Sequence, residues 1–494
     1  MSEPYAARVV GTRKELGAWY TPPDLVDTVV DAVVTPDFVA TRSHPIVVLD
    51  PACGDGRFLA AVHDRIESLG ATSTLIGCDL DPRAIGAARA VLPADAELRQ
   101  ADALAATWSA RQVDLVIGNP PFLSQMAAAT TRGGSSRRGG GPYADAAVEF
   151  LALAGELVDP HGGRVALVLP QSLLASRDAA AIRTSIGERA HMVWSWWTGR
   201  RVFDAQVHVC VLAFEFGRAE PAARRSNWSH VVTSRREVPP VPARLATDAT
   251  LGDRARLNAN FRDEYYGMIP AVGDHDDGPP LVTSGLVDPG RSWWGARSIT
   301  FAKQRFERPR IDLARLDDHM IRWARRRLVP KVLVANQTRI VEAVCDPHGE
   351  WLPAVPVLGV YPTGAHWDDD DRRTPALLEA AAWEIAAVLT SPIASAWLWH
   401  RGAGTGMSAD AIRLSPVTLA ALPWPSGDLG PAVDALHDGD IRRCGAAVDD
   451  AYRVSGDVSL SDSALFEWWS LLLERIETRQ PGTATASVTS PPPR

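Results

Sequence analysis

The chain has 494 residues, a net charge of −8 at pH 7 and an apolar fraction of 46%. This length predicts two or three domains, and the composition is ordinary for globular proteins, so each domain can bury a core. The acidic balance excludes a protein that binds nucleic acid over its whole surface, so any such contact must be a local basic patch.

The cysteines are scattered along the chain and form no C-x-x-C pair. This spacing argues against a disulfide framework and against zinc, and no metal site is predicted. Residues 1–13 hold no signal-peptide core, and no apolar run approaches membrane-spanning length. We therefore expect a reduced, cytoplasmic protein with no membrane attachment.

The first informative stretch contains two structural signals in succession. Thr21-Pro22-Pro23 is typical of a helix start, with a cap followed by prolines. Residues 45–50 then form a β-branched strand that ends in Asp50, and a loop with Gly54 and Gly56 leads into a helix. Glycines let a backbone turn sharply and approach a ligand closely, and the strand-loop-helix context strengthens this interpretation.

Acidic residues end three successive predicted strands, at Asp50, Asp79 and Asp102. An acid that ends the second strand, some twenty residues after a glycine loop, is placed to bind a ribose diol. A capping role explains each acid taken alone. Together, at one edge of a sheet, they favour a nucleoside-like cofactor.

The next apolar run, residues 113–118, is stopped by Asn119-Pro120-Pro121-Phe122, because prolines cannot continue a sheet ladder. The Asn119 side chain and the Pro120 carbonyl are hydrogen-bond acceptors, and Phe122 offers a flat apolar face. This set suits a planar group that carries an NH2, such as the edge of adenine. A simple strand-ending turn explains the same four residues equally well when they are taken alone.

The following residues complete the first domain. The Gly/Ser/Arg-rich stretch 123–143 carries Arg132, Arg137 and Arg138 and is either a surface loop or a contact to phosphate backbone. We predict a strand at 164–170, a helix over 171–188, and strands at 191–197 and 207–216. The last two strands leave no room for a crossover helix, so they should be antiparallel. This makes seven strands.

Helix-strand alternation is lost in the second half of the chain. The predicted boundaries are a first domain at 1–217, a connection at 218–250, a second domain at 251–478 and a disordered Pro/Thr/Ser-rich tail at 479–494. Residues 301–341 are strongly basic, with interleaved aromatics. A solvated face is the ordinary explanation, but nucleic-acid contact is favoured in an acidic chain. The predicted contacts are Arg322, Arg325, Arg326, Arg327 and Lys331.

Taken in order, these motifs resemble those of the γ class of adenine-N6-specific DNA methyltransferases, which use S-adenosylmethionine (SAM). The matched segments are Thr21-Pro22-Pro23, Asp50 to Gly56 and Asn119 to Phe122. Residues 402–425 resemble a segment of the target-recognition regions of type II and type IIG modification enzymes. The resemblance implies an α/β Rossmann-like class I methyltransferase fold, with a seven-stranded, mainly parallel sheet, followed by an α+β target-recognition domain.

The resemblance also implies roles for the matched residues. Thr21 and Asp50, with Ala52, Cys53 and Gly54, would line the pocket for the methionine end of SAM. Asp79 would bind the ribose and Asp102 the adenine of the cofactor. Asn119, Pro120 and Pro121 would form the catalytic turn, with Phe122 stacked on an adenine flipped out of double-stranded DNA. Members of this family act in restriction-modification and phage defence, so the resemblance also implies a possible partner subunit.

One departure from the family pattern concerns the second face of the flipped base. Residues 179–188 hold no aromatic, so Tyr143 or one of the tryptophans in 194–197 is expected there, unless stacking is one-sided. Three alternatives remain open for the whole protein: methylation of a protein glutamine, methylation of guanine N2 in ribosomal RNA, and a non-catalytic DNA-binding subunit. Length and the basic 301–341 region favour DNA as substrate.

Overall fold

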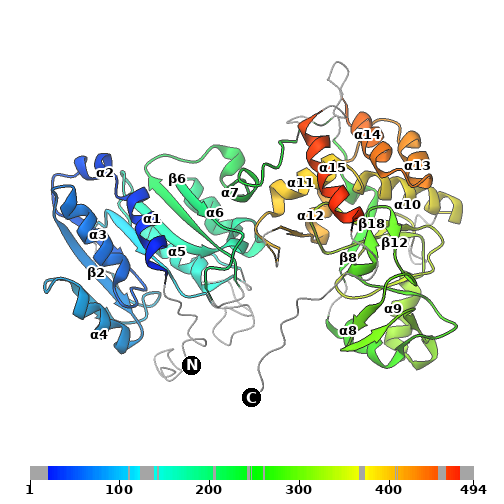
Figure 1. The fold of residues 1–494 in the computed structure, drawn as a ribbon, viewed down its shortest axis with the longest axis horizontal. Helices are drawn as coiled ribbons and strands as arrows, with labels where there is room; N and C mark the ends of the chain where they lie inside the picture. The colour runs from blue at the N-terminus through cyan, green and yellow to red at the C-terminus, as the bar shows by residue number, and fades with distance from the viewer. Residues whose placement is uncertain are drawn as a thin grey trace. The chain divides into compact units, whose positions relative to one another are not determined.

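The computed structural model describes residues 21–108, 112–122, 138–141, 144–203, 207–241, 245, 248–259, 262–365, 373–406, 408, 410–453 and 463–478. The chain divides into two compact units, Met1–Val232 and Thr233–Arg494 (Figure 1). The division falls within the segment 218–250 that was predicted as a connection. Arg132, Arg137, Tyr143 and the tail 479–494 lie outside the described residues.

The N-terminal unit is built on a seven-stranded sheet of order β3-β2-β1-β4-β5-β7-β6. β7 is antiparallel to both its neighbours, and the remaining pairs are parallel. The predicted strand number and the antiparallel pair are therefore confirmed. The strands are β1 (Ile46–Asp50), β2 (Ser73–Asp79), β3 (Glu97–Gln100), β4 (Leu115–Gly118), β5 (Arg164–Pro170), β6 (Ala190–Trp197) and β7 (Val209–Phe216).

Helices cover both faces of this sheet, with α1, α3 and α4 packed side by side and α5 packed with α6 (Figure 1). Their apolar positions follow helical spacing: in α1 the buried residues include Leu25, Val29 and Val33. The Asp145 carboxylate caps α5 by accepting from the Ala147 amide. The helices of the unit are α1 (Pro23–Val33), α2 (Pro36–Ala40), α3 (Arg57–Ser68), α4 (Pro82–Val91), α5 (Ala146–Leu157), α6 (Ala180–Gly187) and α7 (His230–Thr233).

The predicted continuous helix over 171–188 is wrong. The segment consists of two 3₁₀ turns, Gln171–Leu174 and Arg177–Ala179, followed by α6. The backbone extends at Ser176, and the buried Arg183 guanidinium donates to the Leu173 and Ser176 carbonyls at 2.6 and 2.8 Å. A side chain from α6 thus satisfies carbonyls that a continuous helix would have paired internally.

The C-terminal unit is an α+β assembly around a four-stranded antiparallel sheet of order β18-β16-β20-β8. Helix α10 packs against this sheet. The four strands are β8 (Ala255–Ala259), β16 (Lys331–Val334), β18 (Ala343–Asp346) and β20 (Leu358–Pro362). The helices are α8 (Arg262–Met268), α9 (Asp318–Arg327), α10 (Pro375–Leu389), α11 (Pro392–Gly402), α12 (Pro416–Ala420), α13 (Gly430–His437), α14 (Ile441–Ala451) and α15 (Ala464–Glu477).

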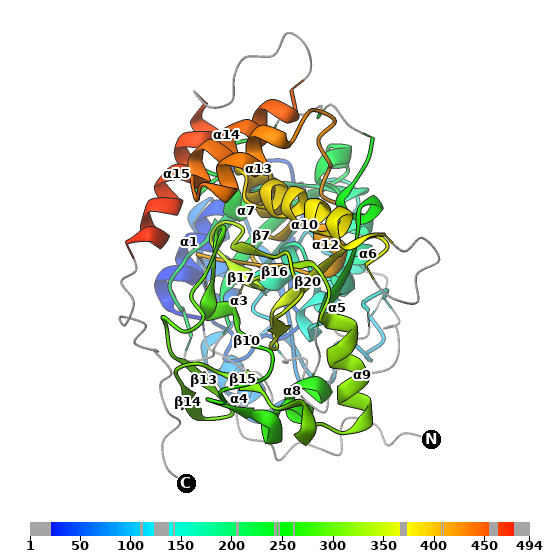
Figure 2. The same ribbon diagram turned by 90° about the vertical axis from the view of Figure 1, so that its right-hand side faces the viewer.

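Five two-stranded ladders complete the C-terminal unit, and Figure 2 shows the β13–β14 hairpin beside β15 in this unit. The ladders are β9 (Val272–Gly273) with β15 (Arg310–Ile311), β10 (Leu281–Val282) with β19 (Leu352–Pro353), β11 (Val287–Asp288) with β12 (Arg291–Ser292), β13 (Ile299–Phe301) with β14 (Gln304–Phe306), and β17 (Gln337–Thr338) with β21 (Ile412–Arg413).

Among the described residues, no single helix is both long and apolar enough to cross a membrane. Helices α10 and α11 reach that length and hydropathy only as a pair, and they meet at an angle of 65°.

Candidate active site

The central parallel strands bring the sequence-predicted acids and the Asn119 turn to one edge of the sheet. β1 lies between β2 and β4, and all three run in the same direction. Their carboxyl ends therefore place Asp50, Asp79 and Asn119 at neighbouring positions. In open α/β sheets this edge is where ligands bind.

Two hydrogen bonds hold the loop after β1 against the end of β2, and a third fixes the start of the loop. The Gly54 amide donates to the Asp79 carboxylate at 2.9 Å, and the Cys53 amide donates to the Cys78 carbonyl at 2.9 Å. The Asp50 carboxylate accepts from the Ala52 amide at 3.0 Å. Gly54 has φ of +54°, a conformation that side-chain-bearing residues rarely adopt, which explains the glycine.

The Asp50 carboxylate also lies directly against the start of the Asn119 turn. A Cβ atom at Gly118 would lie 2.3 Å from the Asp50 Oδ1 atom, so a larger residue there would displace the carboxylate. Asp50 thus contacts both the glycine loop and the backbone that precedes Asn119. The predicted cofactor loop and the predicted catalytic turn meet at this side chain.

Burial makes this edge of the sheet a favourable place for a cation. It raises the pKa of Asp50 to about 8, with smaller contributions from the charges of Asp79 and Asp55 and an opposing hydrogen bond from Ala52. It also raises the pKa of Asp79, against hydrogen bonds from the Asp81 and Gly54 amides. A positively charged ligand would stabilise the ionised form of both carboxylates.

Thr21 and Asp102 have distinct surroundings. Thr21 is buried, and its carbonyl accepts a hydrogen bond from Arg57, which also pairs with Asp55 of the glycine loop. This contact places the Thr21 backbone beside the glycine loop, and the role of Thr21 at the methionine end of the cofactor stays a prediction. Asp102 follows β3, is half-buried, and accepts from the Leu104 amide at 3.0 Å, so it caps a turn at the same edge.

The ring of Phe122, in the turn that follows β4, packs against the ring of Phe203. Its ring centroid lies 6.0 Å from that of Phe203, with the planes inclined by 54°, and both side chains are buried. Asn119 is half-buried and its side-chain oxygen is inaccessible to solvent. The amide acceptor Asn119 therefore lies three residues before a ring that is paired with a second aromatic from a distant part of the chain.

Phe203 belongs to the connection between β6 and β7, which is fixed at its base by Gln171. The buried Gln171 amide nitrogen donates to the Thr198 carbonyl at 3.1 Å and to the Val209 carbonyl at 3.0 Å. These two carbonyls flank the connection on either side. Gln171 is thus placed to position the loop that carries Phe203.

The sequence prediction for the second face of the base named Tyr143 and the tryptophans of 194–197, after helix 179–188 was found to hold no aromatic. It did not include Phe203. Those tryptophans lie within β6, and Tyr143 lies outside the described residues. The signal was available in the topology: β6 ends at the same sheet edge as β4, so an aromatic in the connection after β6 faces the Asn119 turn.

The predicted basic contacts have different environments. The Arg322, Arg325 and Arg326 side chains are exposed on α9. Arg327 is half-buried, with its guanidinium 4.5 Å from the Trp323 ring centroid. Arg138, in the other unit, donates to Glu156 at 2.9 Å and to the Leu104 carbonyl at 3.2 Å.

The prediction of Lys331 as a DNA contact is wrong. Its side chain is 0% exposed, and its ammonium forms an ion pair with Asp346 on the neighbouring strand β18. Burial lowers the pKa of Lys331, and the charge of Asp346 opposes that shift. An ammonium enclosed in this way cannot reach a phosphate.

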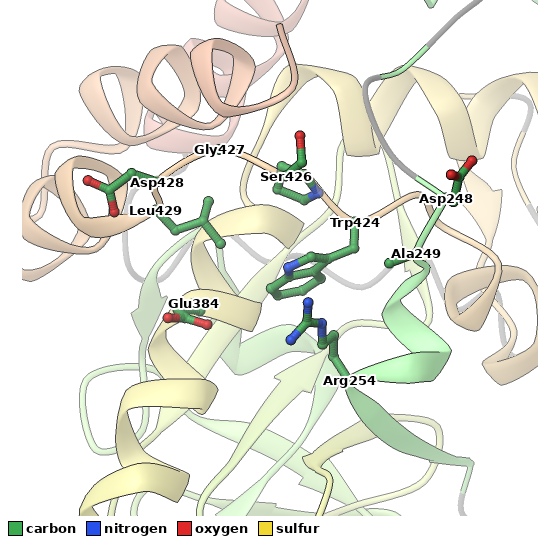
Figure 3. Close-up of a pocket in the computed structure, with 10 residues that line it drawn as sticks. Asp248, Ala249, Arg254, Glu384, Trp424, Ser426, Gly427, Asp428 and Leu429 are labelled. Carbon is green, nitrogen blue, oxygen red and sulfur yellow. The ribbon is translucent and has the colours of Figure 1, made fainter. Parts of the chain in front are cut away.

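A cavity of about 700 Å³ lies in the C-terminal unit (Figure 3). Trp424 lies at its centre, with the Arg254 guanidinium 5.9 Å from the indole centroid. The other charged groups in its wall are the carboxylates of Asp248, Glu384 and Asp428. This charge disfavours binding of a phosphate backbone.

The chain is similar to several known proteins. Residues 5–231 match the family model described as N-6 DNA Methylase. A modification subunit of a type I restriction enzyme from Vibrio vulnificus YJ016 is 21% identical over 41% of this chain and 46% of its own, with a TM-score of 0.33. A protein from Listeria monocytogenes, described as a class I SAM-dependent methyltransferase, is 20% identical over 43% of this chain and 66% of its own, with a TM-score of 0.34.

A longer match is the type IIG restriction endonuclease BpuSI, which is 11% identical over 94% of this chain and 66% of its own, with a TM-score of 0.37. The chain therefore spans about half to two thirds of the length of these three structures.

The strand order 3-2-1-4-5-7-6 with a reversed β7 gives the N-terminal unit the fold of class I SAM-dependent methyltransferases. Its cofactor is S-adenosylmethionine. This unit is also the part of the chain that matches the N-6 DNA Methylase model. The residues present fit this cofactor, because the buried Asp50 and the half-buried Asp79 beside a glycine loop suit a ligand that carries a sulfonium, an ammonium and ribose hydroxyls.

Proposed function

We propose that the protein transfers the methyl group of SAM to the N6 amino group of an adenine flipped out of double-stranded DNA. The observation that carries this proposal is the contact between Asp50 and Gly118, which joins the cofactor edge to the Asn119 turn. An NH2 group held by Asn119 would therefore lie next to the bound cofactor. Adenine inside a duplex cannot reach such a buried turn, so it must leave the stack.

The turn favours attack by the amino nitrogen, because it can accept both of its N–H hydrogens. The adenine N6 lone pair is delocalised into the ring and is a poor nucleophile. The Asn119 side-chain oxygen and the Pro120 carbonyl would draw the nitrogen towards a tetrahedral geometry and localise the lone pair. The cofactor supplies an electrophilic methyl group, and the turn supplies position and electrostatic stabilisation.

The two phenylalanines are placed to hold the flipped base. A base stacked on both rings needs about 7 Å between them, because optimal carbon contacts are about 3.5 Å on each face. The observed centroid distance is 6.0 Å at an inclination of 54°, so the rings would rotate towards parallel and part slightly. Phe203 then supplies the second face of the stack.

Asp79 would bind the ribose hydroxyls of the cofactor, and Asp102 its adenine amino group. Thr21, Asp50 and the loop residues Ala52 to Gly54 would line the methionine end. The C-terminal unit would bind the DNA, with the exposed arginines of α9 as candidate contacts. A restriction-modification or defence setting, with a partner subunit, is supported by the type I and type IIG structures among the matches.

The direct test is Asn119→Ala, because Asn119 carries the only side-chain acceptor in its turn. We expect methylation of DNA to be abolished while SAM binding, measured by calorimetry, stays within a few-fold of wild type. Thr28→Ala, an exposed substitution on α1, is a matched control for handling and folding. Wild-type turnover by Asn119→Ala would contradict the mechanism.

A further inference from the structure

The C-terminal unit presents a short β-hairpin whose tip is basic and exposed. Strands β13 and β14 pair from Ile299–Phe306 to Phe301–Gln304, and Ala302 and Lys303 form the turn. Ile299 and Phe301 are buried, whereas Lys303, Gln304 and Arg305 are exposed. One face of the hairpin is therefore anchored in the core, and the tip is directed to solvent.

The conformation of the tip is costly and is held in place from outside. Ala302 and Lys303 have φ of +47° and +65°, values that glycine adopts freely and other residues rarely adopt. The Ala302 amide donates to the Tyr265 hydroxyl at 3.1 Å, and the Tyr265 ring lies 4.8 Å from that of Phe301. A glycine at position 303 would make the turn more stable, so turn stability does not explain why this residue is a lysine.

Arginines that flank the hairpin in the sequence are stacked on tryptophans. The Arg291 guanidinium lies 3.8 Å from the Trp293 ring centroid, and that of Arg308 lies 5.3 Å from the Trp294 centroid. Both arginine side chains are exposed, so the guanidinium edges remain available. Stacking restricts the rotamers of an arginine before it binds, which reduces the entropy lost when it contacts a phosphate.

Three of the carboxylates near these cations are engaged with the protein itself, whereas Asp276 and Asp277, in the loop after Asp274, are exposed. Asp274 accepts from the Glu307 and Arg308 amides at 3.0 and 2.8 Å. Asp288 accepts from the Trp293 indole at 2.5 Å. Glu307 pairs with Arg305 at 3.1 Å, but both are exposed, so this pair is weak and exchangeable.

Helix α9, the other basic element of the unit, has a simpler explanation. Arg325, Arg326 and Arg327 occupy its last turn, where cations stabilise the helix dipole. The stacked arginines and the basic tip have no such local role. A two-stranded ribbon also fits the major groove of DNA, where base edges can be distinguished.

We propose that the β13–β14 hairpin is the element with which the C-terminal unit reads DNA sequence. Lys303, Gln304 and Arg305 contact base edges in the major groove, and Arg291 and Arg308 contact the flanking phosphates. This inference rests on the proposed function, because it names the surface that selects the adenine to be methylated.

A binding experiment tests the surface independently of catalysis. Binding of the full chain to a fluorescent random-sequence duplex is measured by anisotropy between about 50 and 200 mM salt, the range in which phosphate contacts dominate. Arg291→Ala and Arg308→Ala should each weaken binding and lower the salt slope by about one unit. Arg475→Ala, an exposed arginine on α15, is the matched control and should bind as wild type.

A second experiment tests sequence reading. Lys303→Gly should fold at least as well as wild type, because glycine accepts the observed φ without strain. With Lys303→Gly or Gln304→Ala, single-molecule sequencing of methylated DNA should show about tenfold or greater loss of discrimination at one position of the modified motif. Lys303→Arg should keep more of the discrimination than Lys303→Gly.

Two results would overturn the inference. One is wild-type binding and an unchanged motif in all hairpin variants. The other is a loss of salt slope confined to Arg325→Ala and Arg326→Ala on α9. If wild-type protein produces no N6-methyladenine, the proposed function fails, and the binding experiment still decides whether the hairpin contacts DNA.

Discussion

The buried ion pair between Lys331 and Asp346 gives a prediction that separates stability from DNA binding. The two side chains are 0% and 3% exposed, and the Lys331 ammonium also donates to the Val329 carbonyl at 3.2 Å. Lys331→Met keeps most of the side-chain volume and removes the charge. Asp346 is then left as a buried carboxylate without its counter-ion.

The expected loss of stability can be estimated from the remaining partners of Asp346. Breaking a buried pair by removing one partner costs roughly 3–5 kcal/mol. The Glu350 and Trp351 amides still donate to Asp346, at 3.0 and 2.9 Å, so the lower value of about 3 kcal/mol is expected. The double variant Lys331→Met/Asp346→Asn removes the orphaned charge and should recover about 1–2 kcal/mol of this loss.

Urea unfolding followed by tryptophan fluorescence measures this loss, because Trp351 lies beside the pair. DNA affinity and its salt dependence, measured where the variant is folded, should equal those of wild type. The exposed Arg325→Ala is the matched control: its stability should change by less than about 0.5 kcal/mol. Wild-type stability of Lys331→Met together with a reduced salt slope would refute the burial of Lys331.

Three further predictions follow from the N-terminal site and from α9. Phe203→Ala should lower kcat/KM for DNA about tenfold or more, because it removes a stacking ring, and should leave the affinity for SAM unchanged. Phe203→Tyr should stay largely active. A fully active Phe203→Ala variant would mean that the base stacks on one side only. The pKa of Asp50 is raised to about 8 in the folded state, because burial destabilises its ionised form. Without cofactor, the free energy of unfolding should therefore fall by about 1 kcal/mol per pH unit between pH 4 and pH 8. Asp50→Asn should remove this slope, and an unchanged slope in urea titrations would exclude Asp50 as its source. If α9 contacts phosphate, Arg325→Ala/Arg326→Ala should reduce the salt slope by about two units, and an unchanged slope would place the contact elsewhere.

Much of the N-terminal fold could be predicted from the sequence, because the strands β1, β4, β5 and β7 are buried on both faces and read as continuous apolar runs. The ends of those runs carry Asp50, Asp79 and Asn119, and parallel strand order alone brings them together. The antiparallel β7 followed from the short connection before it. Local sequence and chain connectivity were sufficient for these features.

The rest depended on contacts between distant residues. Arg183 breaks the expected helix over 171–188 by bonding to carbonyls that precede it. Lys331 belongs to a basic run in the sequence, and only the pairing of β16 with β18 brings it next to Asp346. The position of Phe203 beside Phe122 depends on the order of β4, β5, β7 and β6 in the sheet, which the sequence alone does not give. In each case the deciding partner is supplied by tertiary structure and not by neighbours in sequence.

Single-molecule sequencing of DNA treated with the purified protein and SAM tests the central claim most directly. The proposal predicts N6-methyladenine in a defined sequence context with wild-type protein, and none with Asn119→Ala that still binds SAM. Protein that binds SAM but leaves adenine unmodified, or an Asn119→Ala variant that modifies adenine as wild type does, would contradict it.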